Sequence, residues 1–250
     1  GLGDVYKRQT FNRMKYQIYK AETRGRANHG WLITHHSYSF ANYYQEDRIH
    51  FGALRVLNDD VIAAGTGFGR HPHENMEIIT LPQKGALRHE DSMGNGSVIY
   101  PNDIQVMSAG TGIFHAEMNA SETEACEIFQ IWIFPNKQNV APRYEQKSIN
   151  DWRKDNQLYQ ILSPNQNEIG VWIHQDAWMY QGEYSQKTHE TYSVHKENQG
   201  VMLFVIEGKV EFDGIMLNRR DAIEITDAEQ IVFDVEKDSK FLLIEVPLIF

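Results

Sequence analysis

Short runs of β-branched and aromatic residues recur along the chain, separated by clusters of Gly, Asn, Asp and Pro. Examples are FGALRVL at 51–57, MEIITL at 76–81, GSVIYP at 96–101 and CEIFQIWIFP at 126–135. Apolar runs of this length between turn-forming residues are typical of strands, and many of them in succession indicate a β-sandwich or barrel. Long amphipathic helical patterns are missing, and only 148–154 is a candidate for a short helix. We therefore predict an all-β protein.

The strand pattern lapses once, between Pro135 and Asn156. This segment is polar and carries Pro135, Pro142 and several charges, and strand-like runs resume at LYQILS, residues 158–163. Proline and polar residues between periodic segments favour a linker. The rhythm of strand, glycine turn and strand in 79–91 returns in VIEGKVEF, residues 205–212. We interpret the chain as two β modules of similar plan that arose by duplication.

The predicted boundaries follow from this pattern. We expect a first module at 14–140, a linker at 141–155 and a second module at 156–250. The chain opens with GLGDVYKRQ, which lacks Met, fits no later pattern and resembles translated vector or adapter sequence. We expect residues 1–13 to be a non-native leader and Met14 to be the native start.

Composition and charge exclude several classes of function. The chain has 250 residues and a formal charge of −10, which argues against a surface that neutralises nucleic-acid phosphates. No run approaches the roughly 20 apolar residues of a membrane helix, and no signal sequence opens the chain, so we expect a cytoplasmic protein that binds no membrane. Cys126 is the only cysteine, which excludes internal disulfides and thiolate clusters. Any metal must therefore bind to histidines and carboxylates.

Two pairs of such donors have the same spacing. His71 and His73 flank Pro72, and His115 and Glu117 repeat the two-residue step. Residues two apart in a strand project from the same face, so each pair would enter one cavity. Pro72 lacks an amide donor, which suits an edge strand. Each pair alone is a weak signal, but about forty residues separate them, enough for several strands to bring both pairs together.

Three neutral imidazoles and one carboxylate form a ligand set with a definite chemistry. They suit iron, copper, nickel, zinc or manganese, and they leave coordination positions open for a substrate. We predict one divalent transition metal per chain. The ligand types do not choose among these metals.

Several segments are similar to those of a known family: RGRANHGWL, SYSFANYY, ALRVLNDDVI, GFGRHPHENMEIIT, LRHEDSMGN and IQVMSAGTGIFHAEMN. Through them the chain resembles pirin and the bacterial pirin-like proteins of the bicupin superfamily. The resemblance implies two tandem cupin barrels (double-stranded β-helices), of which only the first binds metal, usually Fe(2+). It places the metal ligands at His71, His73, His115 and Glu117. Glu77 occupies the position of the usual cupin carboxylate ligand, and we assign it a supporting or structural role.

Two positions depart from the family pattern. Asn102 replaces the glycine that commonly follows the motif proline, and Ala116 replaces a serine between the second pair of ligands. Asn tolerates left-handed backbone angles, so we expect the turn at Asn102 to survive. The side chain of Ala116 is expected to point away from the cavity.

The resemblance also implies an activity. Bacterial relatives are associated with quercetin 2,3-dioxygenase activity, in which O2 opens a flavonol ring and carbon monoxide is released. Glu117 would then serve as catalytic base as well as metal ligand. The alternative is a non-enzymatic, iron-binding, redox-sensitive regulator of the eukaryotic pirin type, which acts through a protein partner. A third hypothesis is a metalloenzyme acting on another metabolite.

Further residues are candidates for the surroundings of the metal. Polar residues that could support the ligands are His36, Asn42, Glu77 and His89. Apolar residues that could wall an aromatic substrate are Phe51, Met107, Phe114 and Phe129. The scattered histidines of the second module, His174, His189 and His195, are expected to be structural or exposed.

Overall fold

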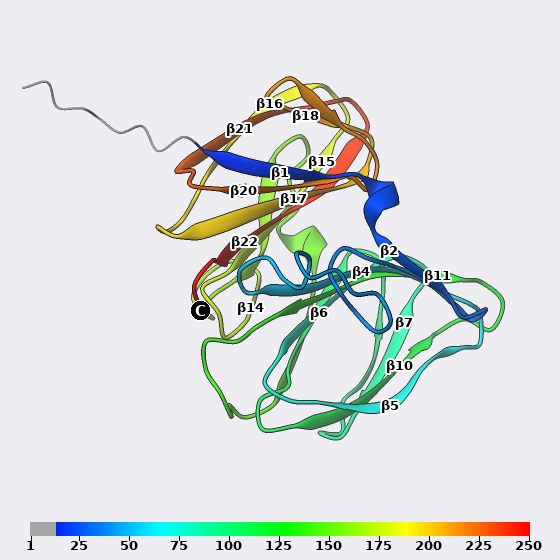
Figure 1. Cartoon of the computed structure of the whole chain (residues 1–250). Helices are drawn as coiled ribbons and strands as arrows, with labels where there is room; N and C mark the ends of the chain where they lie inside the picture. The colour runs from blue at the N-terminus through cyan, green and yellow to red at the C-terminus, as the bar shows by residue number, and fades with distance from the viewer. Residues whose placement is uncertain (1–13) are drawn as a thin grey trace, which may run out of the picture.

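The computed structural model describes residues 14–250, so the predicted leader, residues 1–13, lies outside the described residues. The described chain is built from strands and two short 3-10 helices, which confirms the all-β prediction. Two β modules lie one above the other, and each consists of a seven-stranded and a four-stranded sheet (Figure 1). Residues 14–250 contain no helix that is long and apolar enough to cross a bilayer.

The first module contains the sequence motifs. Its larger sheet has, in spatial order, β12 (Arg143–Ser148), β9 (Asp103–Ser108), β6 (Glu77–Lys84), β11 (Cys126–Ile133), β4 (Leu54–Ile62), β3 (Leu32–His36) and β2 (Gly25–Asn28). Its smaller sheet has β5 (Gly67–His73), β10 (Ile113–Asn119), β7 (Leu87–Asp91) and β8 (Gly96–Ile99). All the neighbouring strands of both sheets are antiparallel.

The second module repeats this plan. Its larger sheet has β1 (Lys15–Tyr19), β20 (Ala222–Thr226), β17 (Gln199–Glu207), β22 (Ser239–Pro247), β15 (Trp178–Tyr184), β13 (Leu158–Ser163) and β14 (Val171–Trp172). Its smaller sheet has β16 (Thr188–Ser193), β21 (Gln230–Val235), β18 (Val210–Phe212) and β19 (Ile215–Leu217). The 3-10 helices are η1 (Ala21–Thr23) and η2 (Ile149–Asp151), and η2 lies within the predicted short helix.

Strand pairing crosses the expected module boundaries at two places. Strand β1 pairs with β20, so the first described strand lies in the sheet of the second module (Figure 1). Strand β12 falls within 141–155, the expected linker, but it pairs with β9 along its whole length. Its polar residues fit this place because β12 is an edge strand with one unpaired side. The boundaries themselves stay a prediction.

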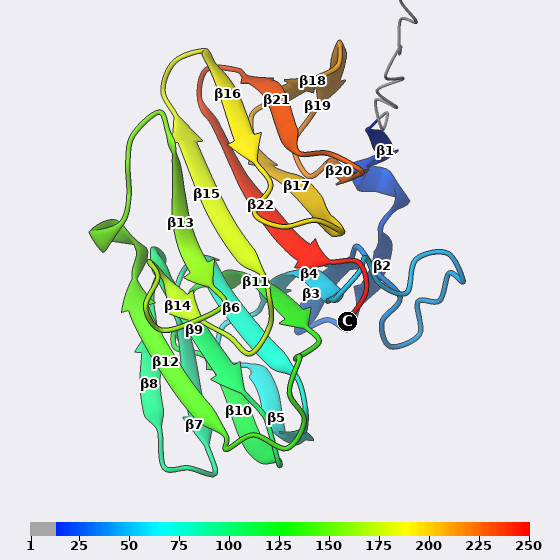
Figure 2. The ribbon, with the colours of Figure 1, turned by 90° about the vertical axis from the view of Figure 1, so that its left-hand side faces the viewer.

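The two larger sheets pack against each other and share a hydrophobic core (Figure 2). The largest apolar cluster contains Leu57, Ile79 and Phe129 from the first module together with Met202 and Phe204 from the second. The rings of Phe129 and Phe204 meet edge to face, with centroids 5.5 Å apart. Because this core lies between the modules, each of them depends on the other for burial of its larger sheet.

The interiors of the two barrels differ in polarity. The second barrel is filled with apolar side chains, among them Val201, Leu203, Val205, Ile223, Ile225 and Phe233. In the first barrel, one row of directly paired buried residues across five neighbouring strands is polar throughout: His36, Asn58, Gln130, Thr80 and Gln105. Such a row needs polar partners. The first barrel therefore offers a polar chamber.

Candidate metal centre

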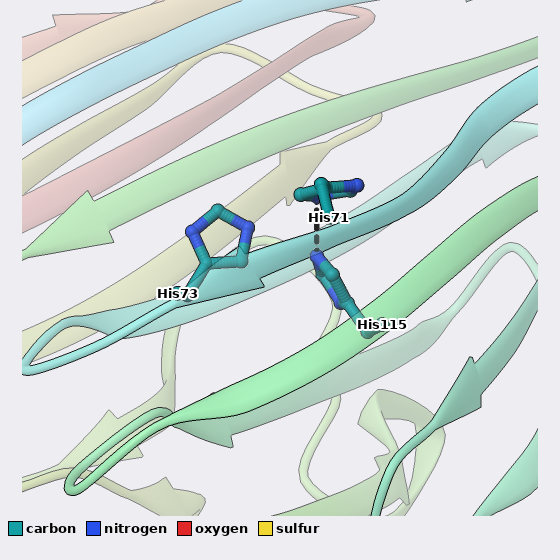
Figure 3. Close-up of side chains that lie close together, drawn as sticks. All are labelled: His71, His73 and His115. Carbon is teal, nitrogen blue, oxygen red and sulfur yellow. Dashed lines mark hydrogen bonds between the residues drawn. The ribbon is translucent and has the colours of Figure 1, made fainter.

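Strands β5 and β10 bring the predicted histidines together. His71 and His73 lie two apart on β5, and His115 on β10 is the direct partner of His71. Pro72 is accommodated because β5 is an edge strand of its sheet, as expected from its missing amide donor. Figure 3 shows the three imidazoles close together, with His115 reaching from β10 toward His71 and His73 on β5.

The imidazoles are close enough to share one ion. The Nε2 atoms of His71 and His115 are 2.7 Å apart, and the ring centroid of His73 lies 4.8 Å from those of both neighbours. One nitrogen from each ring lies within 4.8 Å of the others. Three of the four predicted ligands therefore converge.

Glu117 lies beside this group. Its Oε2 atom is 4.0 Å from Nε2 of His115, and its direct partner on β7 is His89. Glu117, His89 and His115 form a second group whose donor atoms lie within 4.8 Å of one another. His115 belongs to both groups. That Glu117 completes the ligand set of a single ion stays a prediction. His89 was expected only to support the ligands, but it is itself one of the possible donors of the second group.

The protonation of the imidazoles suits a metal. Nδ1 of His71 donates a hydrogen bond to the carbonyl oxygen of Gly69 at 2.6 Å. The Nε2 atom of this ring then carries a lone pair, which is available to a metal ion. Burial, followed by the neighbouring histidines, lowers the pKa of His73 to about 4 and that of His115 to about 3. Neutral imidazole is the form that binds a metal. These residues therefore fit a transition-metal ion.

The carboxylate of Glu117 is held from the opposite sheet. Nε2 of Gln130 donates to both of its oxygens, at 3.2 and 3.0 Å, and the hydroxyl of Thr80 lies 3.5 Å from Oε1. Glu117 is only 1% exposed, and a buried carboxylate needs such partners. Gln130 and Thr80 belong to the polar row, so this row orients the candidate ligand.

His89 is anchored in the same way. Its Nε2 atom lies 2.8 Å from Oδ2 of Asp91, and both side chains are fully buried. Burial raises the pKa of Asp91, but hydrogen bonds from His89 and Asn95 outweigh it and bring this pKa below its usual value. An ionised Asp91 accepts a hydrogen bond from the Nε2–H group of His89 and so fixes the tautomer of this ring.

Glu77 faces away from the metal centre. On β6, Glu77 shares a face with Ile79 and Leu81, which belong to the shared core. Thr80, which contacts Glu117, projects from the other face of the strand. The hydroxyl of Ser108 donates to Glu77 at 2.6 Å. Burial raises the pKa of Glu77 to about 7, although Ser108 and Arg143 oppose the shift. Of the two roles expected for Glu77, the structure supports the structural one.

The expected aromatic wall is wrong for two of its members. Phe51 and Phe129 lie in the shared core. Phe129 is next to Gln130 on β11 and therefore projects from the opposite face of that strand. Phe114 is 46% exposed under the guanidinium of Arg70. Met107 is buried in a small apolar cluster with Ile78 and Ile113. Sequence periodicity identified these as strand residues but did not tell which face each one lines.

The aromatic surface lies elsewhere in the first module. A cavity of about 310 Å³ is lined by Trp31, Phe40 and Phe68, with Gln130 at its boundary. The ring of Phe68 lies 6.5 Å from that of His71. His36, one of the expected supporting residues, also lines this cavity, whereas Asn42 is exposed in a turn. The sequence signal that was missed is the two-residue step of Thr34 and His36 in β3, which places both polar side chains on the cavity side.

Asn102 adopts a φ of 68°, which confirms that the turn survives without glycine. In the second module, His189 is exposed and paired with Asp234, and His195 is paired with the buried carboxylate of Glu245. Both metal-compatible groups found among residues 14–250 lie in the first module.

Comparison with known proteins agrees with this architecture. The family model Pirin matches residues 18–133, and the quercetinase C-terminal cupin domain matches residues 160–246. Quercetin 2,3-dioxygenase of Escherichia coli K12 is 42% identical over 228 residues, which cover 91% of this chain and 97% of that protein. The chain belongs to the pirin family. A pirin-like protein of Caulobacter vibrioides is 38% identical over 222 residues, covering 88% of this chain and 95% of the relative.

A solved structure extends the likeness to the fold of the pirin family. The nickel(II) complex of the bacterial pirin YhhW from Escherichia coli superimposes with a TM-score of 0.88 at 39% identity, covering 93% of this chain and 99% of that one. The predicted bicupin fold and the resemblance to pirin are thereby confirmed.

Proposed function

We propose that this chain is a pirin-like, metal-dependent dioxygenase that opens flavonols such as quercetin with O2 and releases carbon monoxide. The observation that carries the proposal is the convergence of His71, His73 and His115 beside Glu117, next to a cavity lined by aromatic rings. The name of the E. coli relative, quercetin 2,3-dioxygenase, supports the same reaction.

The proposed cofactor is one Fe(2+) ion held by His71, His73, His115 and Glu117. Nickel in the crystal of the E. coli pirin supports binding of a divalent ion, while the choice of iron rests on the family resemblance. When bound, the ion supplies Lewis acidity and open coordination positions. His73 and His115 keep their lone pairs available because burial keeps their pKa values low.

Glu117 is the proposed catalytic base. Its carboxylate would accept the proton of the flavonol 3-hydroxyl, which turns the substrate into an anionic, electron-rich ring. The amide of Gln130 orients this carboxylate through both oxygens. The aromatic cavity would hold the flat ring system and exclude water from it.

The division of labour between the modules is part of the proposal. Residues 14–140 would form the metal-binding cupin and residues 156–250 a metal-free cupin whose interior is filled with apolar side chains. A cytoplasmic location is also proposed, and cell fractionation would test it.

The test begins with metal analysis of the purified protein and anaerobic loading with Fe(2+). Consumption of O2 and release of carbon monoxide in equal amounts with quercetin are expected from the wild type. His73→Ala should lose both metal and activity, whereas His189→Ala, an exposed histidine of the second module, should keep both. Full metal content without turnover of any flavonol would contradict the dioxygenase and favour the iron-binding regulator.

The role of Glu117 requires a separate variant. Glu117→Gln keeps the shape of the side chain but removes its basicity. A loss of rate larger than the loss of metal is expected, of about 100-fold or more for a general base. A variant that kept both its iron and its full ring-opening rate would remove the base assignment.

A further inference from the structure

The cavity beside the metal centre has a polar corner as well as aromatic walls. Thr34 pairs with Asp60 across β3 and β4, and His36 pairs with Asn58. All four side chains line the cavity. Because residues two apart share a face of a strand, the four form one patch of the cavity wall.

Asp60 is the unsatisfied member of this corner. Nδ1 of His36 lies 2.7 Å from Oδ1 of Asn58, so that pair supplies its own hydrogen bond. Asp60 is only 2% exposed, and its Oδ1 atom has no hydrogen-bond partner among residues 14–250. A buried polar atom without a partner costs about 1–3 kcal/mol, so native proteins rarely leave one unpaired. The oxygen lines a cavity, where a ligand can supply the partner.

The charge of Asp60 narrows the kind of partner. Burial raises its pKa to about 7, although the Thr34 hydroxyl opposes the shift. Near neutral pH the carboxyl group can therefore donate or accept a hydrogen bond. A phenolic hydroxyl matches both forms, since it also donates and accepts. Trp31, Phe40 and Phe68 make most of the remaining wall apolar, which suits an aromatic ring that carries such a hydroxyl.

The corner is connected to the candidate metal centre through Gln130. This residue lines the cavity and donates to both oxygens of Glu117. Gln130 is the direct partner of Asn58 on β4. Asp60 lies two residues beyond Asn58 on the same face of β4, roughly 7 Å further along the strand. An aromatic ligand that reaches the metal past Gln130 would thus extend a second ring toward Asp60.

We propose that Asp60 selects hydroxylated aromatic substrates by binding a phenolic hydroxyl on the ring remote from the metal. Trp31, Phe40 and Phe68 would pack against the ring faces, and Asp60 would reject rings that bring no hydroxyl to its buried oxygen. This inference rests on the proposed function for the identity of the ligand. It assigns to Asp60 a role in specificity and none in the metal ligand set.

The test compares two flavonols by calorimetry on the metal-loaded protein. Quercetin carries hydroxyls on its outer rings, and 3-hydroxyflavone keeps only the hydroxyl next to the carbonyl group. The wild type should bind quercetin at least about 10-fold more tightly. Asp60→Leu should abolish this preference by weakening quercetin alone. Asp155→Leu, which changes an exposed aspartate of the expected linker, should preserve it.

Each outcome separates this inference from the proposed reaction. Equal affinities in the wild type, or an unchanged preference in Asp60→Leu, would overturn the role of Asp60. If the leucine variant does not fold, Asp60→Asn serves instead and should lower the preference about fivefold, because a charge-assisted hydrogen bond is lost; an unchanged preference would again refute the inference. Selective binding without carbon monoxide release would support Asp60 and refute the dioxygenase reaction. A purely structural Asp60 would change stability but leave the preference intact.

Discussion

His71 and His115 are directly opposed on β5 and β10, and their Nε2 atoms lie 2.7 Å apart. Opposed residues of an antiparallel pair have Cβ atoms about 5 Å apart, so two rings on the same face converge without any special backbone geometry. The register of this one strand pair therefore creates the core of the candidate metal site. His73 and Glu117 extend it by one step along each strand.

Loss of His115 should be more damaging than loss of any supporting residue, because His115 belongs to both metal-compatible groups. We expect His115→Ala to weaken nickel(II) binding by more than the roughly 10–100-fold that loss of an outer partner costs. Titration with nickel(II) followed by calorimetry measures this effect. His189→Ala is the control, and an unchanged affinity in His115→Ala would contradict the site.

Gln130 should act on the metal through Glu117. Gln130→Leu removes the donor to both carboxylate oxygens, so we expect metal affinity to fall by about 10–100-fold. Gln181→Leu is a matched control, since Gln181 is a buried glutamine of the second module. Both variants should lose stability. Equal metal affinities for the two variants would show that Gln130 does not position Glu117.

Glu77 should make stability depend on pH. Its pKa is raised from 4.5 to about 7, so its favourable contribution is complete below pH 4.5 and is lost as the pH rises through about 7. Glu77→Gln does not ionise. As the pH rises from 4.5 to 7, the free energy of unfolding of the variant should therefore increase relative to that of the wild type, by up to about 3 kcal/mol. Urea unfolding at pH 5 and pH 8 measures this pH-dependent difference in stability. Glu197→Gln, at an exposed position, should show no such difference. A difference independent of pH would contradict the assignment.

The shared core should make the two modules unfold together. Phe204 of the second module packs on Phe129 of the first, and Phe204→Ala should cost about 3–5 kcal/mol. Unfolding of the metal-free variant, followed by tryptophan fluorescence and circular dichroism, should show coincident transitions. Phe250→Ala, at a 54% exposed position, should change stability by less than about 1 kcal/mol. Separate transitions for the two signals would refute the coupling.

Part of the site was predictable because it depends on local geometry. The two-residue spacing of His71 and His73 and of His115 and Glu117 sets which side chains share a face in any extended strand. The turn at Asn102 was likewise predictable, since left-handed angles are a property of the residue type. Asp60 was not singled out, because its significance depends on a cavity formed by residues from four strands and the segments that flank them.

The sequence by itself determined the strands, the two-module plan and the candidate ligand pairs, because hydrophobic period and turn chemistry act over a few residues. Tertiary structure decided that β1 joins the sheet of the second module. It also decided that Glu77 and Phe129 face the shared core while Thr80 and Gln130 face the candidate metal centre. The physical reason is that alternation along a strand divides its residues between two faces. Only pairing with distant strands and packing against a second sheet determine which face becomes the chamber and which becomes the core.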